Sequence, residues 1–508
     1  MYLEDKNIHR GLMATVMLVT VAFLLYPAYL PMADLPQHAV QVAVLDDLLK
    51  GRSPWSDMLV LHWDTPYWTT YSVWLLLHQF IGMAWSPKIV VILILLFYMA
   101  SVRLVRRAFR ASRLTDWVAL TCFFGFAFQW GFVSFLAGIP VGMLFLAANK
   151  FWLDTQKPKY LWMIAFLGIW SYYSHVLTFA FFCFISYGMF LVDFRRLSWK
   201  QRGMLTLPYL LFAGMLLRYL TKPNPEPFMY YPEGRWENPG IFQKTSELLF
   251  YPWNMGQLFY YDFACAALLL APPLLGYRPS RDVKRYALLL GSLAIWYALP
   301  HIGFQTAYIY QRFGLFVPVF WYLVWQPQEA AGRRYDMKQV AVTAFVCAVA
   351  ALMFKVYSNN VLFDSSETVK DFDEVVATMP SEKRILGLGE PFMWGDGKLT
   401  SFAEYLHFAQ WYQVKKRGWA DYSFASAHAM PVRLKLKKMY PGYGYNRLVD
   451  EKNLTEILDC SIYSYLLVRT QKTPGELQRL LDRNPRCNSV RLNKQAGQWL
   501  LFENPAVQ

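Results

Sequence analysis

The sequence predicts a polytopic α-helical membrane protein with a soluble domain at its C-terminal end. Hydrophobic residues make up 56% of the 508 residues and charged residues only 17%, against about 25% charged residues in ordinary globular chains. The mean hydropathy is only +0.20, lower than a chain buried wholly in lipid would have, so part of the chain should be water-soluble. The net charge of +15 does not indicate a nucleic-acid partner, because the 33 Tyr, 38 Phe and 20 Trp stand in long apolar runs that lipid interfaces favour.

Apolar runs of about 18 to 20 residues recur through the first 357 residues, and a run of that length spans the hydrocarbon layer as a helix. The first run is longer than the apolar core of a signal peptide and lacks a cleavage site of the small-x-small type, so it should be a retained anchor. We expect eleven crossings, at residues 11–30, 87–105, 114–133, 134–153, 160–174, 175–192, 203–220, 258–276, 286–301, 313–325 and 339–357.

The apolar segment 66–84 is different, because polar residues such as His78 and Gln79 interrupt it. Five arginines between 103 and 113 follow the next crossing, and short basic loops stay on the cytoplasmic side. If 66–84 also crossed, that basic cluster would lie outside whenever the amino terminus is inside. We therefore predict that 66–84 is an aromatic, amphipathic helix in the outer interface.

This topology distributes the basic residues as the positive-inside rule requires. The predicted inner segments hold 21 Lys and Arg, and the outer loops of the bundle hold about nine. With a cytoplasmic amino terminus, eleven crossings place the tail outside, in the periplasm if the membrane is a bacterial inner membrane. The sequence therefore predicts a transmembrane bundle of residues 1–357, with a first outer loop at 31–86, and an extracytoplasmic domain of residues 358–508.

The extracytoplasmic domain has short strands and helices in alternation. Strands are predicted at 384–388, 463–468 and 499–502, and helices at 372–379 and 404–416. Thr473-Pro474-Gly475-Glu476 is a capping box with proline at the first helical position, which predicts a helix to Asp482. The order strand, helix, strand indicates an α/β or α+β fold.

Cys460 and Cys487 are the cysteines of this domain, and each stands near the start of a predicted strand. An extracytoplasmic compartment permits a disulfide between them, which would stabilise the domain by roughly 3 to 4 kcal/mol. Two free thiols are the alternative. The other four cysteines fall in predicted membrane helices, and no Cys or His spacing indicates structural zinc.

The first outer loop carries the most informative pattern. Ala33-Asp34-Leu35-Pro36-Gln37-His38 follows the first crossing and opens a helix to Leu48, and His62-Trp63-Asp64-Thr65-Pro66-Tyr67-Trp68 precedes the interfacial helix. The next crossing ends in the arginine cluster. This order resembles the GT-C superfamily of integral-membrane glycosyltransferases, among which the aminoarabinose transferases and protein mannosyltransferases share the layout. Many members have Asp-Glu where this chain has Asp34-Leu35, so the resemblance carries no metal ligand over to this motif.

The resemblance implies inverting transfer of a sugar from a polyprenyl-phosphate carrier to a lipid or glycan acceptor on the outer face of the membrane. A sugar hydroxyl is a poor nucleophile and needs a positioned base; Asp34 is the candidate. The leaving phosphate needs a cation at headgroup depth, for which the planar fork of arginine is suited. Arg312 heads the tenth predicted crossing at the outer interface, where the positive-inside rule predicts no arginine, and is the first candidate for this clamp.

Four other residues complete the predicted site. Arg218 and Lys222, at the outer end of the seventh crossing, are the second candidates for the lipid phosphate. Asp64 could orient the acceptor or a divalent cation, whose participation the sequence leaves open. His38 lies one helical turn from Asp34 on the same face and is expected to support it.

The candidates also have structural interpretations. Asp34 and Asp64 stand at helix starts, where carboxylates cap helices, and Arg312 could bind bulk lipid headgroups. In the tail, His407 begins an aromatic and basic stretch that ends at Trp419. This stretch could contact an acceptor sugar, or it could pack as a helix on its own domain.

Two other classes of protein remain as alternatives. One is a transporter or a non-catalytic scaffold for lipid-linked envelope glycans. A transporter usually places ionisable groups near the bilayer midplane, whereas seven of the eight histidines here are predicted on the outer side. The other is an oligosaccharide ligase or polymerase, which usually relies on Arg and His in a large outer loop and not on a carboxylate after the first helix.

Overall fold

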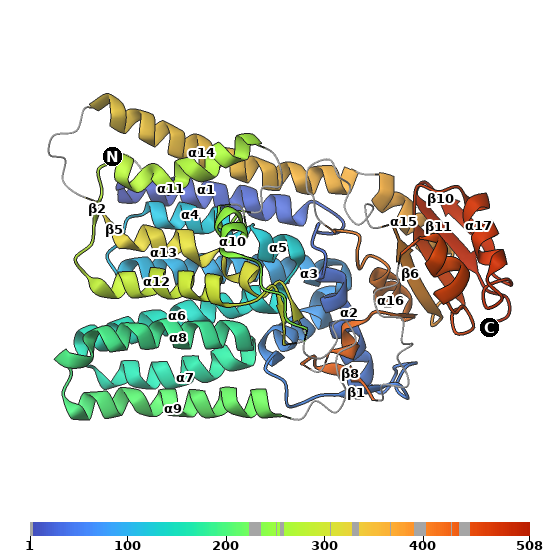
Figure 1. Ribbon diagram of the computed structural model, residues 1–508, viewed down its shortest axis with the longest axis horizontal. Coiled ribbons are helices and arrows are strands. Elements are labelled where there is room, and N and C mark those ends of the chain that lie inside the picture. Colours follow the sequence, from blue (N-terminus) through green and yellow to red (C-terminus); the bar gives the residue numbers. More distant parts are fainter. Residues whose placement is uncertain are drawn as a thin grey trace.

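The computed structural model describes residues 4–222, 235–249, 251–253, 259–304, 306–327, 335–365, 367–390, 403–427, 429–435 and 448–507. Over these residues, a long helical bundle and a smaller domain with a β-sheet lie end to end along the longest axis of the molecule (Figure 1). The first outer loop and part of the C-terminal region lie between the bundle and the sheet.

The helices of the bundle run mostly along the long axis (Figure 1). They are α1 (Lys6–Leu25), α3 (Trp68–Ala108), α4 (Leu114–Phe123), α5 (Phe126–Trp130), α6 (Val133–Thr155), α7 (Pro158–Ser174), α8 (Val176–Asp193), α9 (Trp199–Thr221), α11 (Phe259–Leu274), α12 (Val283–Ala298), α13 (Phe316–Val324) and α14 (Tyr335–Ser365). Helix α6 is the most deeply buried of the long ones, because it packs against α3, α7 and α8. The short helices η2 (Phe194–Arg196), α10 (Ile241–Leu248) and η3 (Tyr310–Phe313) connect parts of the bundle.

Six helices in the described residues are long and apolar enough to cross a membrane: Lys6–Leu25, Trp68–Ala108, Val133–Thr155, Val176–Arg196, Trp199–Thr221 and Met337–Thr378. The other predicted crossings fall on helices of at most 17 residues, such as α7, α12 and α13. The segment 114–133, predicted as one crossing, is divided into α4 and α5. The number of eleven crossings therefore stays a prediction.

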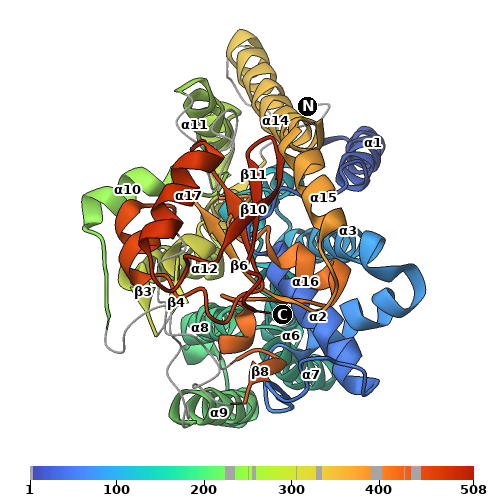
Figure 2. The ribbon, with the colours of Figure 1, turned by 90° about the vertical axis from the view of Figure 1, so that its right-hand side faces the viewer.

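The predicted interfacial helix and the crossing after it form the single element α3, with a kink at Gly82. The backbone of Gly82 has φ 66° and ψ 178°, a conformation that glycine adopts without steric cost. The kink separates residues 68–81 from the long apolar part that ends at Arg106 and Arg107. In Figure 2 the α3 ribbon reaches the edge of the molecule when it is seen from the end that carries the sheet.

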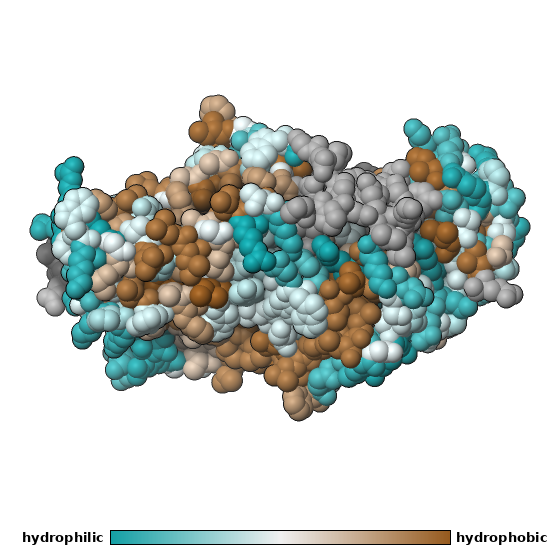
Figure 3. Space-filling view, turned by 90° about the horizontal axis from the view of Figure 1, so that it is seen from below, coloured by the Kyte–Doolittle hydropathy of each residue, from teal (hydrophilic) through white to brown (hydrophobic). Residues whose placement is uncertain are grey.

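Large apolar side chains are exposed on the outside of the bundle, as a lipid-facing surface requires. Leu18, Phe80, Trp162, Leu207 and Phe354 are each more than two-thirds exposed. Figure 3 shows hydrophobic residues over much of the bundle on one face, with hydrophilic residues at its far end and over the C-terminal domain. Together with the six long helices, this surface makes the chain an integral membrane protein.

The C-terminal domain contains a five-stranded mixed sheet in the order β10-β11-β9-β6-β7. Its strands are β6 (Arg384–Gly389), β7 (Trp419–Ala420), β9 (Tyr465–Arg469), β10 (Arg491–Ala496) and β11 (Trp499–Glu503), with β6 parallel to β7 and β9. Helix α15 (Glu367–Thr378) contacts β10 and β11, and helix α17 (Pro474–Arg483) contacts β10. Helix α17 begins with the predicted capping box. A disulfide joins Cys460 and Cys487, so the alternative of two free thiols is wrong.

Some features of this domain differ from the prediction, and one is the two-residue strand β7, which was not predicted. Strand β10 was not predicted, because its sequence Arg-Leu-Asn-Lys-Gln-Ala is mostly exposed at the edge of the sheet and shows no buried alternation. The predicted helix 404–416 is shorter, since α16 spans only Gln410–Lys416.

The C-terminal region also packs onto the first outer loop. Helix α16 contacts α2 (Leu35–Leu49), and β8 (Val432–Leu434) pairs antiparallel with β1 (Leu59–Leu61). The indole N–H of Trp55 donates to the carbonyl of Arg417, 2.9 Å away. Residues 403–427 and 429–435 therefore cover the outer loop that carries Asp34, a contact that the sequence did not indicate.

Candidate functional site

Asp34 stands where the chain enters α2, and its side chain makes no capping hydrogen bond with that helix. The predicted alternative, in which the carboxylate caps the helix, is therefore not realised. The side chain is only 7% exposed, and the residue lines a cavity beside the helix start. Asp34 is therefore a buried carboxylate that faces a cavity and does not cap the helix it precedes.

The turn between α5 and α6 holds the backbone of Asp34. The Asp34 N–H donates to the carbonyl of Trp130 at 2.9 Å, and the Ala33 N–H donates to the carbonyl of Gln129 at 3.1 Å. Gly131 follows with φ +85°, and a Cβ atom there would lie 2.8 Å from the Asp34 nitrogen. Only glycine lets the turn approach Asp34 so closely.

The cavity beside Asp34 has a volume of about 720 Å³, within the usual range for ligand sites. Its polar side chains come from segments far apart in the sequence and include Asp34, His38, Tyr67, His175, Arg312 and His407. Apolar side chains of α8 and α9, including Val176, Leu216 and Leu220, line another part of it. The cavity thus combines a carboxylate, a cation and an apolar wall at the end of the bundle that faces the C-terminal domain.

His407 of the C-terminal domain lies against Asp34. Its Nε2 atom is 3.3 Å from Asp34 Oδ1, and its Nδ1 atom is 2.9 Å from the side-chain nitrogen of Gln37. Both His407 and Gln37 are buried. Asp34 therefore has an imidazole partner that comes from the other domain.

His38 faces the same cavity from the first turn of α2. Its Nδ1 atom lies 2.6 Å from the hydroxyl of Tyr71. The pKa of His38 is lowered to about 3, mainly by burial and also by the positive charge of Arg312, whereas a hydrogen bond with the Gly131 backbone acts in the opposite direction. His38 is therefore neutral at pH 7 and acts as a hydrogen-bonding group next to Asp34.

Arg312 lies in η3, directly after the small hairpin of β3 (Ile302–Gly303) and β4 (Thr306–Ala307). Its guanidinium donates to the carbonyls of Tyr308 and Ala307 at 3.2 and 3.0 Å, and its central carbon is 3.7 Å from the centre of the Phe132 ring. These contacts hold the cation at the wall of the Asp34 cavity. Such fixed geometry differs from that of an arginine that only binds bulk lipid headgroups.

Asp64, Arg218 and Lys222 do not line this cavity and form a separate surface cluster. Asp64 Oδ2 is 2.9 Å from the guanidinium of Arg218 and 3.0 Å from Lys222 Nζ. The hydrogen bond with Lys222 lowers the pKa of Asp64, and the Asp64 side chain is half exposed. Asp64 balances one of the two positive charges, so the cluster keeps a net positive charge outside the cavity. Helix α9 reaches the cavity with Tyr219 instead.

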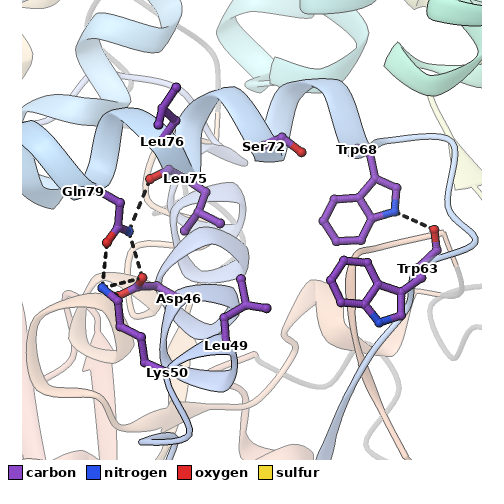
Figure 4. Close-up of a pocket in the computed structure, with 9 residues that line it drawn as sticks. All are labelled: Asp46, Leu49, Lys50, Trp63, Trp68, Ser72, Leu75, Leu76 and Gln79. Atoms are coloured by element: carbon purple, nitrogen blue, oxygen red, sulfur yellow. Dashed lines mark hydrogen bonds and ion pairs between the residues drawn. The ribbon is translucent and has the colours of Figure 1, made fainter.

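A second groove, of about 660 Å³, lies between the end of α2 and the start of α3. Figure 4 shows the stacked indoles of Trp63 and Trp68 at one end and the hydrogen-bonded side chains of Asp46, Lys50 and Gln79 at the other. None of its lining residues lines the Asp34 cavity. Since the charged groups of the groove bind one another, we treat it as part of the packing between α2 and α3.

A metal site has no support in the described part of the chain. No group of three or more His, Cys, Asp and Glu side chains is placed there to hold a metal ion. The described side chains around Asp34 do not form such a group either.

Comparisons with known proteins found similarity only at the level of structure. No family model and no curated protein matches the chain. The arabinofuranosyltransferase AftD from mycobacteria has a TM-score of 0.52 and 12% identity, over 97% of this chain and 40% of that one. ArnT from Cupriavidus metallidurans has a TM-score of 0.44, with 12% identity over 98% of both chains in the apo state. Bound to undecaprenyl phosphate, it has the same TM-score, with 11% identity over 99% of this chain and 100% of that one.

The chain thus spans less than half the length of AftD. At 12% identity, the likeness shows the fold alone. The protein is an integral membrane protein, and its fold is similar to that of AftD.

The sequence missed some of the residues that the structure brings to the site. Gln37 stood inside the quoted motif but had no predicted role, and His407 was considered only for acceptor binding or helix packing. His175 lines the cavity between α7 and α8. The concentration of histidines on the predicted outer side could have indicated His175 and His407.

Proposed function

We propose that this protein is a membrane glycosyltransferase that moves a sugar from a polyprenyl-phosphate carrier to a lipid or glycan acceptor on the outer face of the membrane. The observation that carries the proposal is that Asp34 and Arg312, a carboxylate and a cation far apart in the sequence, line the same cavity of about 720 Å³. The GT-C-like fold supports it, because AftD is an arabinofuranosyltransferase.

In the proposed reaction, Asp34 is the general base. It takes the proton from the acceptor hydroxyl while the hydroxyl oxygen forms a bond to the reacting sugar carbon. The bond from that carbon to the phosphate oxygen breaks on the opposite side, so the configuration inverts and the polyprenyl phosphate leaves. A positioned base of this kind typically contributes 10²- to 10⁴-fold to the rate.

Arg312 is the proposed clamp for the leaving phosphate. A guanidinium in a fixed position stabilises the charge that builds up on the phosphate oxygens, and its planar fork binds two of them. The apolar wall formed by Leu216, Leu220 and Val176 suits the prenyl chain of the carrier. The C-terminal region also lines the cavity, with Leu406, His407 and Met430 among its side chains. Through these side chains the C-terminal domain would help to bind the acceptor.

The proposed setting is a bacterial inner membrane with a cytoplasmic amino terminus and a periplasmic C-terminal domain. The distribution of basic residues supports this orientation. The reacting groups then lie at the outer interface, where lipid-linked sugars and envelope acceptors meet.

Turnover by the full-length protein in nanodiscs tests this function. The probe is the mixture of polyprenyl-phosphate-linked sugars extracted from bacterial membranes, with a cell-envelope glycolipid fraction as acceptor, and released polyprenyl phosphate is measured by mass spectrometry. We expect release by the wild type and a loss of about 100-fold or more in Asp34→Asn. Asp57→Asn is the matched control, because Asp57 is an exposed residue of the same outer loop. Full activity of Asp34→Asn would refute the assignment of the base.

The alternatives make different predictions in the same experiment. For a transporter or scaffold, Asp34→Asn would be silent, while substitutions near the bilayer midplane would abolish function. For a ligase or polymerase, activity would depend on Arg312 and outer histidines but not on Asp34.

A further inference from the structure

We infer that His407 is a positioning residue that the C-terminal domain inserts beside the base, so that Asp34 is fully competent only when this domain is docked. The inference rests on the proposed function and deepens it. Its basis is a chain of hydrogen-bonding groups from the C-terminal backbone through Gln37 and His407 to Asp34.

The orientation of the Gln37 side chain is fixed by the backbone of the C-terminal domain. Its oxygen accepts the N–H of Phe424 at 2.9 Å, and its nitrogen donates to the carbonyl of Tyr422 at 2.7 Å. A flipped amide would place oxygen against oxygen and N–H against N–H at these two contacts. The group that faces His407 Nδ1, 2.9 Å away, is therefore the donating nitrogen of Gln37.

This donor fixes the tautomer of His407. Nδ1 must accept the hydrogen bond from Gln37, so the proton of the neutral imidazole is on Nε2. Nε2 is the atom that lies 3.3 Å from Asp34 Oδ1. A second proton on Nδ1 would point at the Gln37 donor in a site where His407 is only 6% exposed, so the neutral form is favoured.

The consequence for Asp34 is a defined orientation. An N–H that faces Oδ1 favours the carboxylate form and restrains rotation of the carboxylate, which directs Oδ2 to the acceptor hydroxyl. The distance of 3.3 Å is slightly long for a hydrogen bond, and contacts of this kind tighten when substrate binds. His407 does not touch the reacting atoms in this mechanism.

The chain of groups crosses the boundary between the two domains. Asp34 and Gln37 belong to the first outer loop, whereas His407, Tyr422 and Phe424 belong to the C-terminal region. The interface around them is extensive, since α16 packs on α2 and β8 pairs with β1. Docking of residues 403–427 therefore supplies His407 as the partner of the base, together with the two backbone groups that set the tautomer of His407.

A matched pair of substitutions distinguishes the contribution of His407 Nε2 from that of Nδ1. In His407→Gln the amide nitrogen reaches the position of Nε2 and keeps a donor for Asp34, whereas in His407→Asn the amide reaches only the position of Nδ1. With the extracted lipid-linked sugars as donor, we expect His407→Asn to lower kcat by about 10- to 100-fold with little change in the donor KM. We expect His407→Gln to keep activity within about fivefold of the wild type. A purely structural role predicts equal losses, or loss of folded protein, in both variants, and that result would overturn the inference.

An NMR measurement tests the same point without any activity. In protein labelled with 15N-histidine in nanodiscs at pH 7.5, the signal that disappears in His407→Asn should show a neutral ring protonated on Nε2. In Asp34→Asn this tautomer should persist, with a changed shift of the Nε2 proton. A ring protonated on Nδ1, or a charged ring, would refute the inference whatever the enzyme does. An inactive His407→Asn together with a fully active Asp34→Asn would refute the proposed base and leave the tautomer result as a separate finding.

Discussion

Gly131→Ala is the most direct perturbation of the position of Asp34. Gly131 has φ +85°, and its added Cβ would lie 2.8 Å from the Asp34 nitrogen and 3.0 Å from the Leu35 nitrogen. An L residue with such a backbone costs roughly 1 to 2 kcal/mol. Because ordinary contacts begin at 3.4 Å, the backbone of Asp34 must also move by about 0.6 Å. Since a displacement of about 1 Å can cost 100-fold in rate, we expect turnover to fall by about tenfold or more.

Gly51→Ala is the matched control for this experiment. Gly51 follows the other end of α2 and has φ +64°, but nothing lies within 4 Å of its added Cβ. It therefore carries a similar backbone strain without a displacement of Asp34. Both variants are compared in nanodiscs for apparent melting temperature and for release of polyprenyl phosphate. If Gly131→Ala and Gly51→Ala lose activity to the same extent, the turn between α5 and α6 does not position the base, and the reasoning is wrong.

Three further predictions address the clamp, a buried histidine and the disulfide. Arg312→Lys keeps the charge but loses the planar fork, so the donor KM should rise by about tenfold; an unchanged KM would remove Arg312 from the phosphate site. The pKa of His38 is lowered to about 3 in the folded protein, whereas it is about 6.5 in the unfolded chain. Between these two pH values the His38 side chain binds a proton in the unfolded chain but not in the folded one. Stability is therefore lost as the pH falls from about 6.5 to 3, by about 2 kcal/mol at pH 5 for this group. Thermal unfolding at pH 7.5 and pH 5 should show a smaller acid effect in His38→Asn than in the wild type, and equal acid effects would contradict the assignment. Replacing Cys460 and Cys487 by serine should destabilise the C-terminal domain by roughly 3 to 4 kcal/mol in the chain-entropy model, detected as faster trypsin cleavage of that domain; cleavage at the wild-type rate would show that the bond contributes little.

The sequence predicted the parts of the fold that depend on local patterns. Apolar runs located the long membrane helices, because burial in lipid requires a minimum length of uninterrupted hydrophobic residues. The capping box at Thr473 located the start of α17, because the hydrogen bonds of a cap involve only neighbouring residues. Buried strands such as β6 and β9 were visible for the same reason, whereas the exposed edge strand β10 left no hydrophobic signal.

The candidate site was predictable only in part. Asp34 and Arg312 stood out individually, one by its place after the first helix and the other by its charge on the outer side. Asp64, Arg218 and Lys222 stood out for similar reasons, but the structure pairs them with one another outside the cavity. A charged residue in the sequence indicates that an oppositely charged group should lie near it. The sequence does not indicate which residue supplies that group.

The sequence by itself determined the apolar runs of a membrane protein, and it predicted an orientation with an acidic residue and an arginine on the outer side of the bundle. Only the tertiary structure decided that these two residues line one cavity, and that His407, more than 370 positions after Asp34, lies against the carboxylate. Hydrophobic periodicity specifies which face of an element is buried, but it does not specify what covers that face. Here the covering segment consists of residues 403–427 and 429–435. The β1–β8 pairing and the packing of α16 on α2 hold this segment on the first outer loop. These contacts form only when the chain folds back on itself.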